Sequence, residues 1–404
     1  SAIADQAELT ATAILAPPPG TQYEAWLVED DGQRTSLGLL SLDSTGQGKL
    51  TFAGEQGTNL VAQYSGIEIT IEPSPDPDTN PSGIVAYSFY YPQDALPHLR
   101  SLLSSSANTP NRAALIQGLT TDIQTINEFA KEMQKSSANT NIDRVHLYAE
   151  AILNILVGDQ SDKHKDWNGD GQVDDPSDGF GLVLNGRNLG YLQATYIEAD
   201  AAVRASGASE QLVTYGEGVK ISVQDLAQWT EQLEELISSI LASPSSSSIA
   251  PLVLQASTLA EKMVNGIDLD EDGVVEPVFN EAGVLVAYEQ AYHMADMPLQ
   301  AVGIRNLGTG TPTFVLVTVT PGGGGGRGGQ TVLPTQNTPP GQQNNTSAPP
   351  PGQQKTPKPP PPGQQKTKEP PPGQQKTKKP NPGNTSDNNG NKNNGNNATP
   401  NVVP

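Results

Sequence analysis

The stretch "YEAWLVEDDG", residues 23–32, sets the fold class for the first part of this 404-residue chain. Aromatic and aliphatic side chains in its first half are typical of a strand, and the polar DDG that follows is typical of a turn. The segment "IEITIE", residues 67–72, places its three isoleucines on one face of a second strand. Gly and Pro separate several such runs at short intervals, which is typical of a small sandwich or barrel, and of these we predict an all-β sandwich over residues 1–93.

The order of these segments resembles the extracytoplasmic C-terminal domain of anti-sigma-K factors. The segment "PPPGTQYEAWLVEDDGQRTSLGLLSLDSTGQGKLTF" carries a YxxWL strand and a glycine turn, and "IEITIEPSPDPDTNPSGIVAYS" carries a late EP and Pro-Gly segment. The resemblance extends over about residues 7–92 and implies a position outside the cytoplasmic membrane. The sigma-binding segment and transmembrane helix of those proteins have no counterpart here, so we expect any membrane anchor to lie outside this sequence.

After Pro97 the hydrophobic pattern changes to the period of a helix. Val145, Ala149 and Ile152, for example, follow one another at helical spacing. Segments with this spacing are 112–134, 142–157, 188–203, 222–242, 251–264 and 283–297. We therefore predict an α-helical bundle of six or seven members over residues 94–300, which makes the chain an α+β multidomain protein.

The last part of the chain contains one predicted strand and a long polar tail. The segment "TPTFVLVTVTP" alternates and is rich in β-branched residues, so residues 301–320 predict a strand that pairs with the N-terminal sheet or with a neighbouring subunit. Residues 321–404 are rich in Pro, Gly, Gln and Asn and repeat the motif PPGQQ. With almost no side chains that could build a core, this segment is predicted to be disordered.

The charge of the chain is divided unevenly. The tail carries eight Lys and one Arg against Glu369 and Asp387, or +7, so residues 1–320 carry −28 of the total of −21. Such a field repels nucleic acid and attracts divalent cations and basic partners. The chain has no Cys, which excludes disulfides and thiolate metal sites. No apolar run reaches 18 residues, so no membrane span is expected.

The first of two acidic segments, "DWNGDGQVDDPSD" at residues 166–178, resembles an EF-hand or dockerin-type calcium loop. Calcium takes six to eight oxygen ligands, and an EF-hand supplies them from positions 1, 3, 5, 7, 9 and 12, with Gly at position 6. The candidate ligands of this loop are Asp166, Asn168, Asp170, the carbonyl of Gln172, Asp174 and Asp178. Asp178 follows position 12 by one residue, so only the first half of the loop matches the standard pattern.

The second acidic segment, residues 268–281, has the same pattern in its first half. Its candidate ligands are Asp268, Asp270, Asp272, the carbonyl of Val274, Glu276 and Glu281. Phe279 occupies position 12 and cannot bind a metal, while Glu281 follows two residues later. This site would therefore need a longer loop than the standard one.

Two explanations of these segments remain open. Asp and Asn often cap backbone amides in turns that bind no metal. Two matches, each with an apolar residue at position 8 and predicted helices on both sides, favour metal. The many protein-derived oxygens favour Ca²⁺ over Mg²⁺. Each half of the bundle is then helix, acidic loop and helix, as a duplication would produce.

Catalytic motifs are absent from the sequence, so we expect no enzyme: there is no GxSxG, HExxH, P-loop or dinucleotide-binding glycine pattern. His146 has Glu150 four residues later, and His293 has Glu289 four residues earlier. A haem or metal pocket between helices could use such pairs. The alternative is a partly buried histidine with a helical neighbour.

These observations favour a non-catalytic, extracytoplasmic calcium-binding structural protein of the cell surface or of an extracellular appendage. Its expected partners are further copies of itself in a homopolymer or filament, or other cell-surface components. A first alternative is the sensor region of an anti-sigma-type regulator separated from its membrane anchor. A second is a haem-binding or metal-binding helical-bundle protein.

Overall fold

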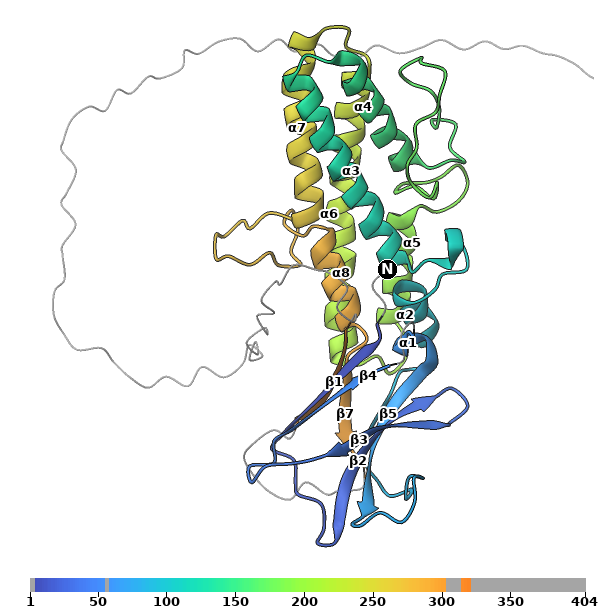
Figure 1. Ribbon diagram of the computed structural model, residues 1–404, viewed down its shortest axis with the longest axis vertical. Coiled ribbons are helices and arrows are strands. Elements are labelled where there is room, and N and C mark those ends of the chain that lie inside the picture. The colour runs from blue at the N-terminus through green and yellow to red at the C-terminus, as the bar shows by residue number, and fades with distance from the viewer. Residues whose placement is uncertain (1–3, 55–57, 303–313, 321–404) are drawn as a thin grey trace, which may run out of the picture. The chain divides into compact units, whose positions relative to one another are not determined.

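The computed structural model describes residues 4–54, 58–302 and 314–320, and the YEAWLVEDDG stretch forms a strand and a turn in it (Figure 1). Strand β2 (Thr21–Glu29) pairs antiparallel with β3 (Arg34–Leu40). Between them Gly32 adopts a φ of 86°, and its N–H donates to the carbonyl of Glu29 over 3.0 Å. A tight turn of this kind favours glycine at that position.

One antiparallel sheet of eight strands contains all the described strands. The other six are β1 (Gln6–Thr12), β4 (Gly48–Ala53), β5 (Tyr64–Pro73), β6 (Val85–Tyr90), β7 (Met297–Ala301) and β8 (Phe314–Thr320). Their order is β3-β2-β5-β6-β7-β8-β1-β4, and the outermost strands, β3 and β4, come close to each other. The sheet is therefore nearly closed, like a barrel, and the predicted two-sheet sandwich is wrong. The alternating pattern predicts strands in either arrangement and cannot distinguish them.

Two strands return to the sheet after the helices, where the sequence predicted one. β8 pairs with β1 from Gln6 opposite Thr320 to Thr12 opposite Phe314, and β7 lies between β8 and β6. The short β7 was hidden because its first residue, Met297, continues the helical pattern that precedes it. Among the described strands, β1 and β4 form one hydrogen-bonded group and β2, β3, β5 and β6 form another. β7 and β8 connect the two groups.

The helices lie between β6 and β7 in the sequence, apart from the short α1 (Leu60–Gln63). They are α2 (Leu96–Leu103), the 3₁₀ turn η1 (Pro110–Arg112), α3 (Leu115–Ala138), α4 (Ile142–Val157), α5 (Tyr191–Val203), α6 (Glu210–Leu241), α7 (Ser246–Asn265) and α8 (Val284–His293). Figure 1 shows α3, α4, α6 and α7 packed side by side, with α5 and α8 along α6. The helical bundle is thus an insertion between two neighbouring strands.

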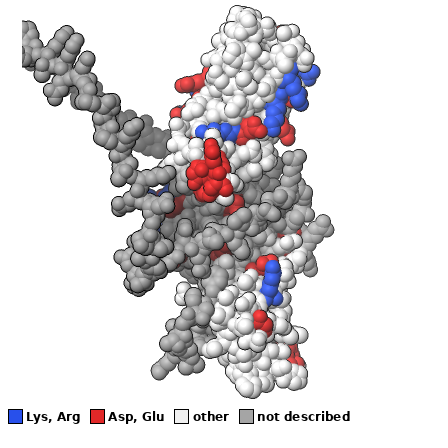
Figure 2. Space-filling view, turned by 90° about the vertical axis from the view of Figure 1, so that its left-hand side faces the viewer, with Lys and Arg blue, Asp and Glu red and all other residues white. Residues whose placement is uncertain are grey.

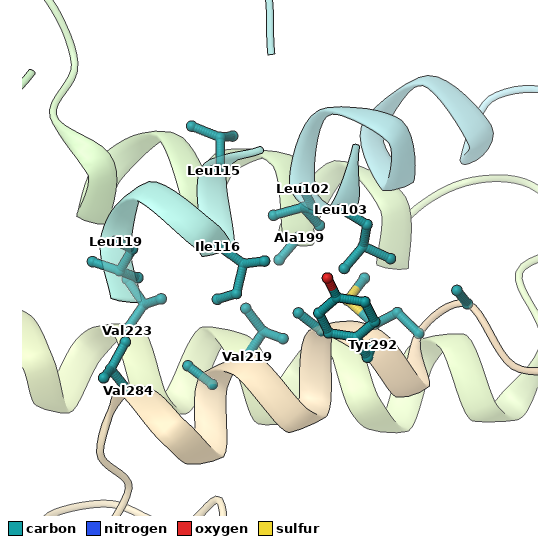
Figure 3. Packing of buried hydrophobic residues seen from close by; sticks show 14 of the residues in the cluster. Leu102, Leu103, Leu115, Ile116, Leu119, Ala199, Val219, Val223, Val284 and Tyr292 are labelled. Atoms are coloured by element: carbon teal, nitrogen blue, oxygen red, sulfur yellow. The ribbon is translucent and has the colours of Figure 1, made fainter. Parts of the chain in front are cut away.

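The core of the bundle continues into the sheet. Ile116 and Leu119 of α3 pack together with Val219 and Val223 of α6, all with no more than 3 % exposure (Figure 3). At the junction with the sheet, the hydroxyl of Tyr91, just after β6, donates a hydrogen bond to the carbonyl of Ala295, just before β7. The two ends of the insertion therefore meet.

None of the described helices is long and apolar enough to cross a membrane. The predicted disordered tail, residues 321–404, lies outside the described residues.

Candidate functional site

The two acidic loops connect their helices in the same way. The first joins α4 to α5 and the second joins α7 to α8, on opposite sides of the bundle in Figure 1. Each preceding helix ends at a glycine with positive φ, Gly158 at 74° and Gly266 at 75°. Each following helix starts after a glycine, Gly190 or Gly283, in an extended conformation. A Cβ on Gly266 would lie 2.3 Å from the carbonyl oxygen of Glu281, so the two ends of the second loop touch at this glycine.

Backbone amides inside each loop are capped by the acidic side chains in a common pattern. Position 1, Asp166 or Asp268, accepts hydrogen bonds from the N–H groups of positions 4 and 6, at 2.6 to 2.9 Å. Positions 3 and 5 each accept from the amide two residues later. These contacts are those of capped turns, and they give both loops the same backbone shape.

The second loop also brings carboxylates together. Asp268, Asp270 and Asp272 each offer an oxygen within 4.8 Å of the other two. Figure 2 looks onto the side from which this loop projects in Figure 1 and shows a compact patch of Asp and Glu there. Val274, whose carbonyl is the predicted ligand at position 7, is 44 % exposed.

The first loop differs in the arrangement of its predicted ligands. Within the described part of the chain, Asp166, Asp170 and Asp174 do not form such a group, and Gln172 is exposed. Asp178 points elsewhere, because one oxygen accepts from the N–H of Phe180 at 2.9 Å and the other from the hydroxyl of Tyr191 at 2.6 Å. The structure therefore does not bring Asp178 to the rest of the loop.

A buried glutamate from outside the acidic segment holds the first loop. Glu150 in α4 is fully buried, and its carboxylate accepts the N–H groups of Trp167, Asn168 and Asp174 at 2.9, 2.9 and 3.0 Å. Its helical spacing suggests a pairing with His146, and only the folded chain shows that it serves the loop. The feature of the sequence that could have indicated this buried role is a carboxylate within the apolar run "AEAILNILV".

The second loop has an equivalent glutamate within its own sequence. Glu281, 3 % exposed, accepts the N–H of Glu276 at 2.9 Å, as Glu150 accepts that of the matching position in the first loop. Asp225 in α6, which sequence reasoning missed as a loop partner, accepts the N–H groups of Asn280, Glu281 and Ala282 at 2.8 to 3.2 Å.

Crowding of negative charge perturbs position 9 in both loops. The carboxylate of Glu281 together with burial and Asp272 raises the pKa of Glu276 to about 7. Burial and the nearby Glu150 raise the pKa of Asp174, whose buried Oδ2 has no hydrogen-bond partner among the described residues. A bound proton or a bound cation relieves such repulsion.

The family comparison concerns the sheet. Residues 1–85 match the family described as "Anti-sigma-K factor rskA, C-terminal". The predicted resemblance to anti-sigma-K factors is therefore confirmed. The match spans β1 to β5 and ends at the first residue of β6, so it leaves out the two returning strands. No curated protein and no solved structure matches the chain.

The match corrects the functional prediction. An anti-sigma-K domain belongs to a regulator, so the predicted role as a calcium-binding structural protein of the cell surface is wrong. The acidic loops dominated that prediction, although they lie in the helical insertion, outside the matched residues. The match supports the first alternative, the sensor region of an anti-sigma-type regulator.

The residues of the two histidine pairs have different local contacts in the structure. Nδ1 of His293 lies 3.0 Å from Asp296, which raises the pKa of His293, and its ring stacks on Tyr215 at 4.8 Å. Nε2 of His146 is buried without a hydrogen-bond partner among the described residues, and Glu150 is engaged by the first loop. No contact between the two histidines is found in the described residues.

Proposed function

We propose that this chain is the signal-receiving region of an anti-sigma-type regulator and that it lies outside the cytoplasmic membrane. The observation that carries the proposal is the anti-sigma-K match over residues 1–85. The regulator as a whole would act on a sigma factor as its partner. A charge of −28 on residues 1–320 supports a receiving region that does not contact nucleic acid.

The sheet supports a receiving role for the helical insertion as well. The strands of the matched region form two hydrogen-bonded groups. β7 and β8, which follow the helices in the sequence, connect these two groups. Tyr91 and Ala295 tie the two ends of the insertion together. A ligand that changes the packing of the helices would therefore act directly on neighbouring strands of the anti-sigma-K sheet.

A transcription experiment in the host bacterium tests the regulatory role. An in-frame deletion of the codons for residues 1–320 should change the transcript levels of genes that depend on one sigma factor. Deletion of the codons for residues 330–404 serves as the control, since it leaves the described fold intact. Unchanged transcript levels in the first strain would contradict the regulatory role.

The location is tested separately by protease treatment of spheroplasts. Cleavage of the chain in spheroplasts with an intact cytoplasmic membrane is expected. Protection until the membrane is lysed would show that the region lies in the cytoplasm.

A further inference from the structure

A polar cleft of about 640 Å³ lies beside the first loop, at the end far from its acidic turn. Its walls come from the α2–α3 connection, from residues 158–190 and from α5, on the right of the bundle in Figure 1. Its volume is within the range of small-molecule sites in proteins.

Buried polar side chains make the wall of this cleft rigid. Asn185 is 4 % exposed, and its amide nitrogen donates to the carbonyls of Gly179 at 2.9 Å and Phe180 at 3.0 Å. Its Oδ1 accepts the N–H of Gln160 at 2.6 Å. Together with the two hydrogen bonds of Asp178, these contacts fix the loop before any ligand arrives, and a site fixed in advance loses less entropy on binding.

The residues that form this wall have no counterpart in the other half of the bundle. The connection from Gly158 to Gly190 has roughly twice as many residues as the corresponding connection from Gly266 to Gly283. The acidic turn and the glycines at the helix ends account for the shorter connection. The additional residues of the longer one form the cleft wall, so the cleft is not needed to join the two helices.

Two of the three carboxylates in the cleft have hydrogen-bond partners on other elements of the fold. Asp178 is engaged by Tyr191, and Glu198 lies 2.5 Å from Nδ1 of His98. Asp159 and Arg187 remain as one negative and one positive group in the same lining. A phosphate or nucleotide would meet three carboxylates, and a lipid chain would leave the polar lining unsatisfied.

The lining of the cleft contains both hydrogen-bonding groups and apolar surface. Arg187, Asn108 and Asn188 line it with exposed donors. Leu189 and Ile197 expose 42 % and 49 % of their surface in the same lining. Sugars present both kinds of surface, because hydroxyl groups project around a ring whose faces carry C–H groups.

We propose that this cleft binds a short neutral oligosaccharide. The inference rests on the proposed function in one respect only, since the sugar would be the signal that the regulator receives. Binding itself is a property of the purified chain and can be measured without any transcription assay.

Titration of the purified full-length chain tests the site. The probes are tetrasaccharides of N-acetylglucosamine, of β1,4-linked glucose and of α1,4-linked glucose. Trilysine and inorganic phosphate are the alternative ligands, and binding of each is measured by calorimetry. At least one tetrasaccharide should bind with a Kd of about 1 mM or tighter. Absence of binding by all three sugars, or binding of trilysine or phosphate alone, would overturn the proposal.

Matched substitutions show whether the sugar occupies this cleft. Arg187→Ala and Ile197→Ser should each weaken binding about fivefold or more, because they remove a donor and an apolar contact. Lys131→Ala and Leu254→Ser change exposed residues of the same kinds on α3 and α7 and should leave the Kd unchanged. Equal Kd values in all four variants would exclude the cleft.

The two proposals fail in different ways. If a sugar binds but deletion of residues 1–320 leaves transcription unchanged, the site stands and the regulatory role fails. If transcription changes but no tetrasaccharide binds, the regulatory role stands and the site fails.

Discussion

A single buried carboxylate organises the first acidic loop. Glu150 is fully buried in α4, and three backbone N–H groups of the loop donate to it. Hydrogen bonds to a charged acceptor are stronger than those to a neutral one, and a buried amide that loses its acceptor carries a desolvation cost. The shape of the loop therefore depends on Glu150, a residue of the preceding helix that lies outside the loop sequence.

Replacement of this carboxylate should destabilise the fold. We expect Glu150→Gln to lower the free energy of unfolding by about 2–4 kcal/mol, since an amide offers only one accepting oxygen for the three N–H groups. Urea unfolding followed by circular dichroism measures the change. Glu128→Gln, an exposed substitution on α3, is the control and should have little effect. Equal stability of the two variants would contradict the role of Glu150.

Asp122 in α3 gives the protein a pH dependence. It is 3 % exposed, its Oδ2 has no hydrogen-bond partner among the described residues, and burial with the nearby Asp178 and Asp175 raises its pKa to about 8. The folded state binds this proton more tightly than the unfolded state does. Its contribution to stability is therefore complete below about pH 4 and is lost as the pH rises through about 8.

An uncharged substitute should remove this dependence. We expect Asp122→Asn to be more stable than the parent at about pH 8.5, by at least about 1 kcal/mol, and to lose this advantage near pH 4. Urea unfolding across this pH range measures the difference. Asp94→Asn, at an exposed position, should follow the parent. A constant difference at all pH values would show that Asp122 does not titrate in this window.

At the scale of elements, the sequence predicts what is local. Helical spacing identified the segments that became α3 to α8, and alternation identified most N-terminal strands. The closure of the sheet depends on β7 and β8, which pair with strands far away in sequence. The same limit hid Glu150 and Asp225 as partners of the loops, because only the packing of α4 and α6 brings them there.

Calcium binding by the acidic loops stays a prediction, separate from the structural role that the family match contradicts. If the second loop binds Ca²⁺, about 100 times the Kd of free calcium should stabilise the fold by about 2.7 kcal/mol relative to EGTA. Thermal unfolding in the two buffers measures this. Asp272→Asn should reduce the shift, whereas Asp78→Asn, which caps a backbone amide in another turn, should not. Identical melting temperatures with calcium and EGTA would rule the site out.

At the scale of the whole molecule, the region that matches the anti-sigma-K family and the helices depend on each other. Residues 1–93 contain six strands that form two hydrogen-bonded groups, and β7 and β8 join these groups. The sequence predicted one returning strand over residues 301–320 but left its partner open between the N-terminal sheet and a neighbouring subunit. The resemblance covers only the strands before the helices, so it does not decide between these partners.

A fragment of residues 1–93 should therefore not fold alone, whereas residues 1–320 should. Without β8, the seven residue pairs between β8 and β1 are lost, and buried side chains such as Leu9 become exposed. Amide chemical-shift dispersion in NMR spectra of the two fragments measures the difference. A dispersed spectrum of the shorter fragment would show that the N-terminal strands close without the returning pair.

The pairing of β1 with β8 also has a consequence for how the chain is made. The paired residues lie roughly 300 positions apart. The ribosome therefore synthesises β1 before all the helices, and its partner β8 only after them. Contacts of such long sequence separation form late and slow folding. A ribosome-bound or prematurely terminated chain therefore exposes an unfinished sheet, and only a chain translated through Thr320 can complete the eight-stranded sheet.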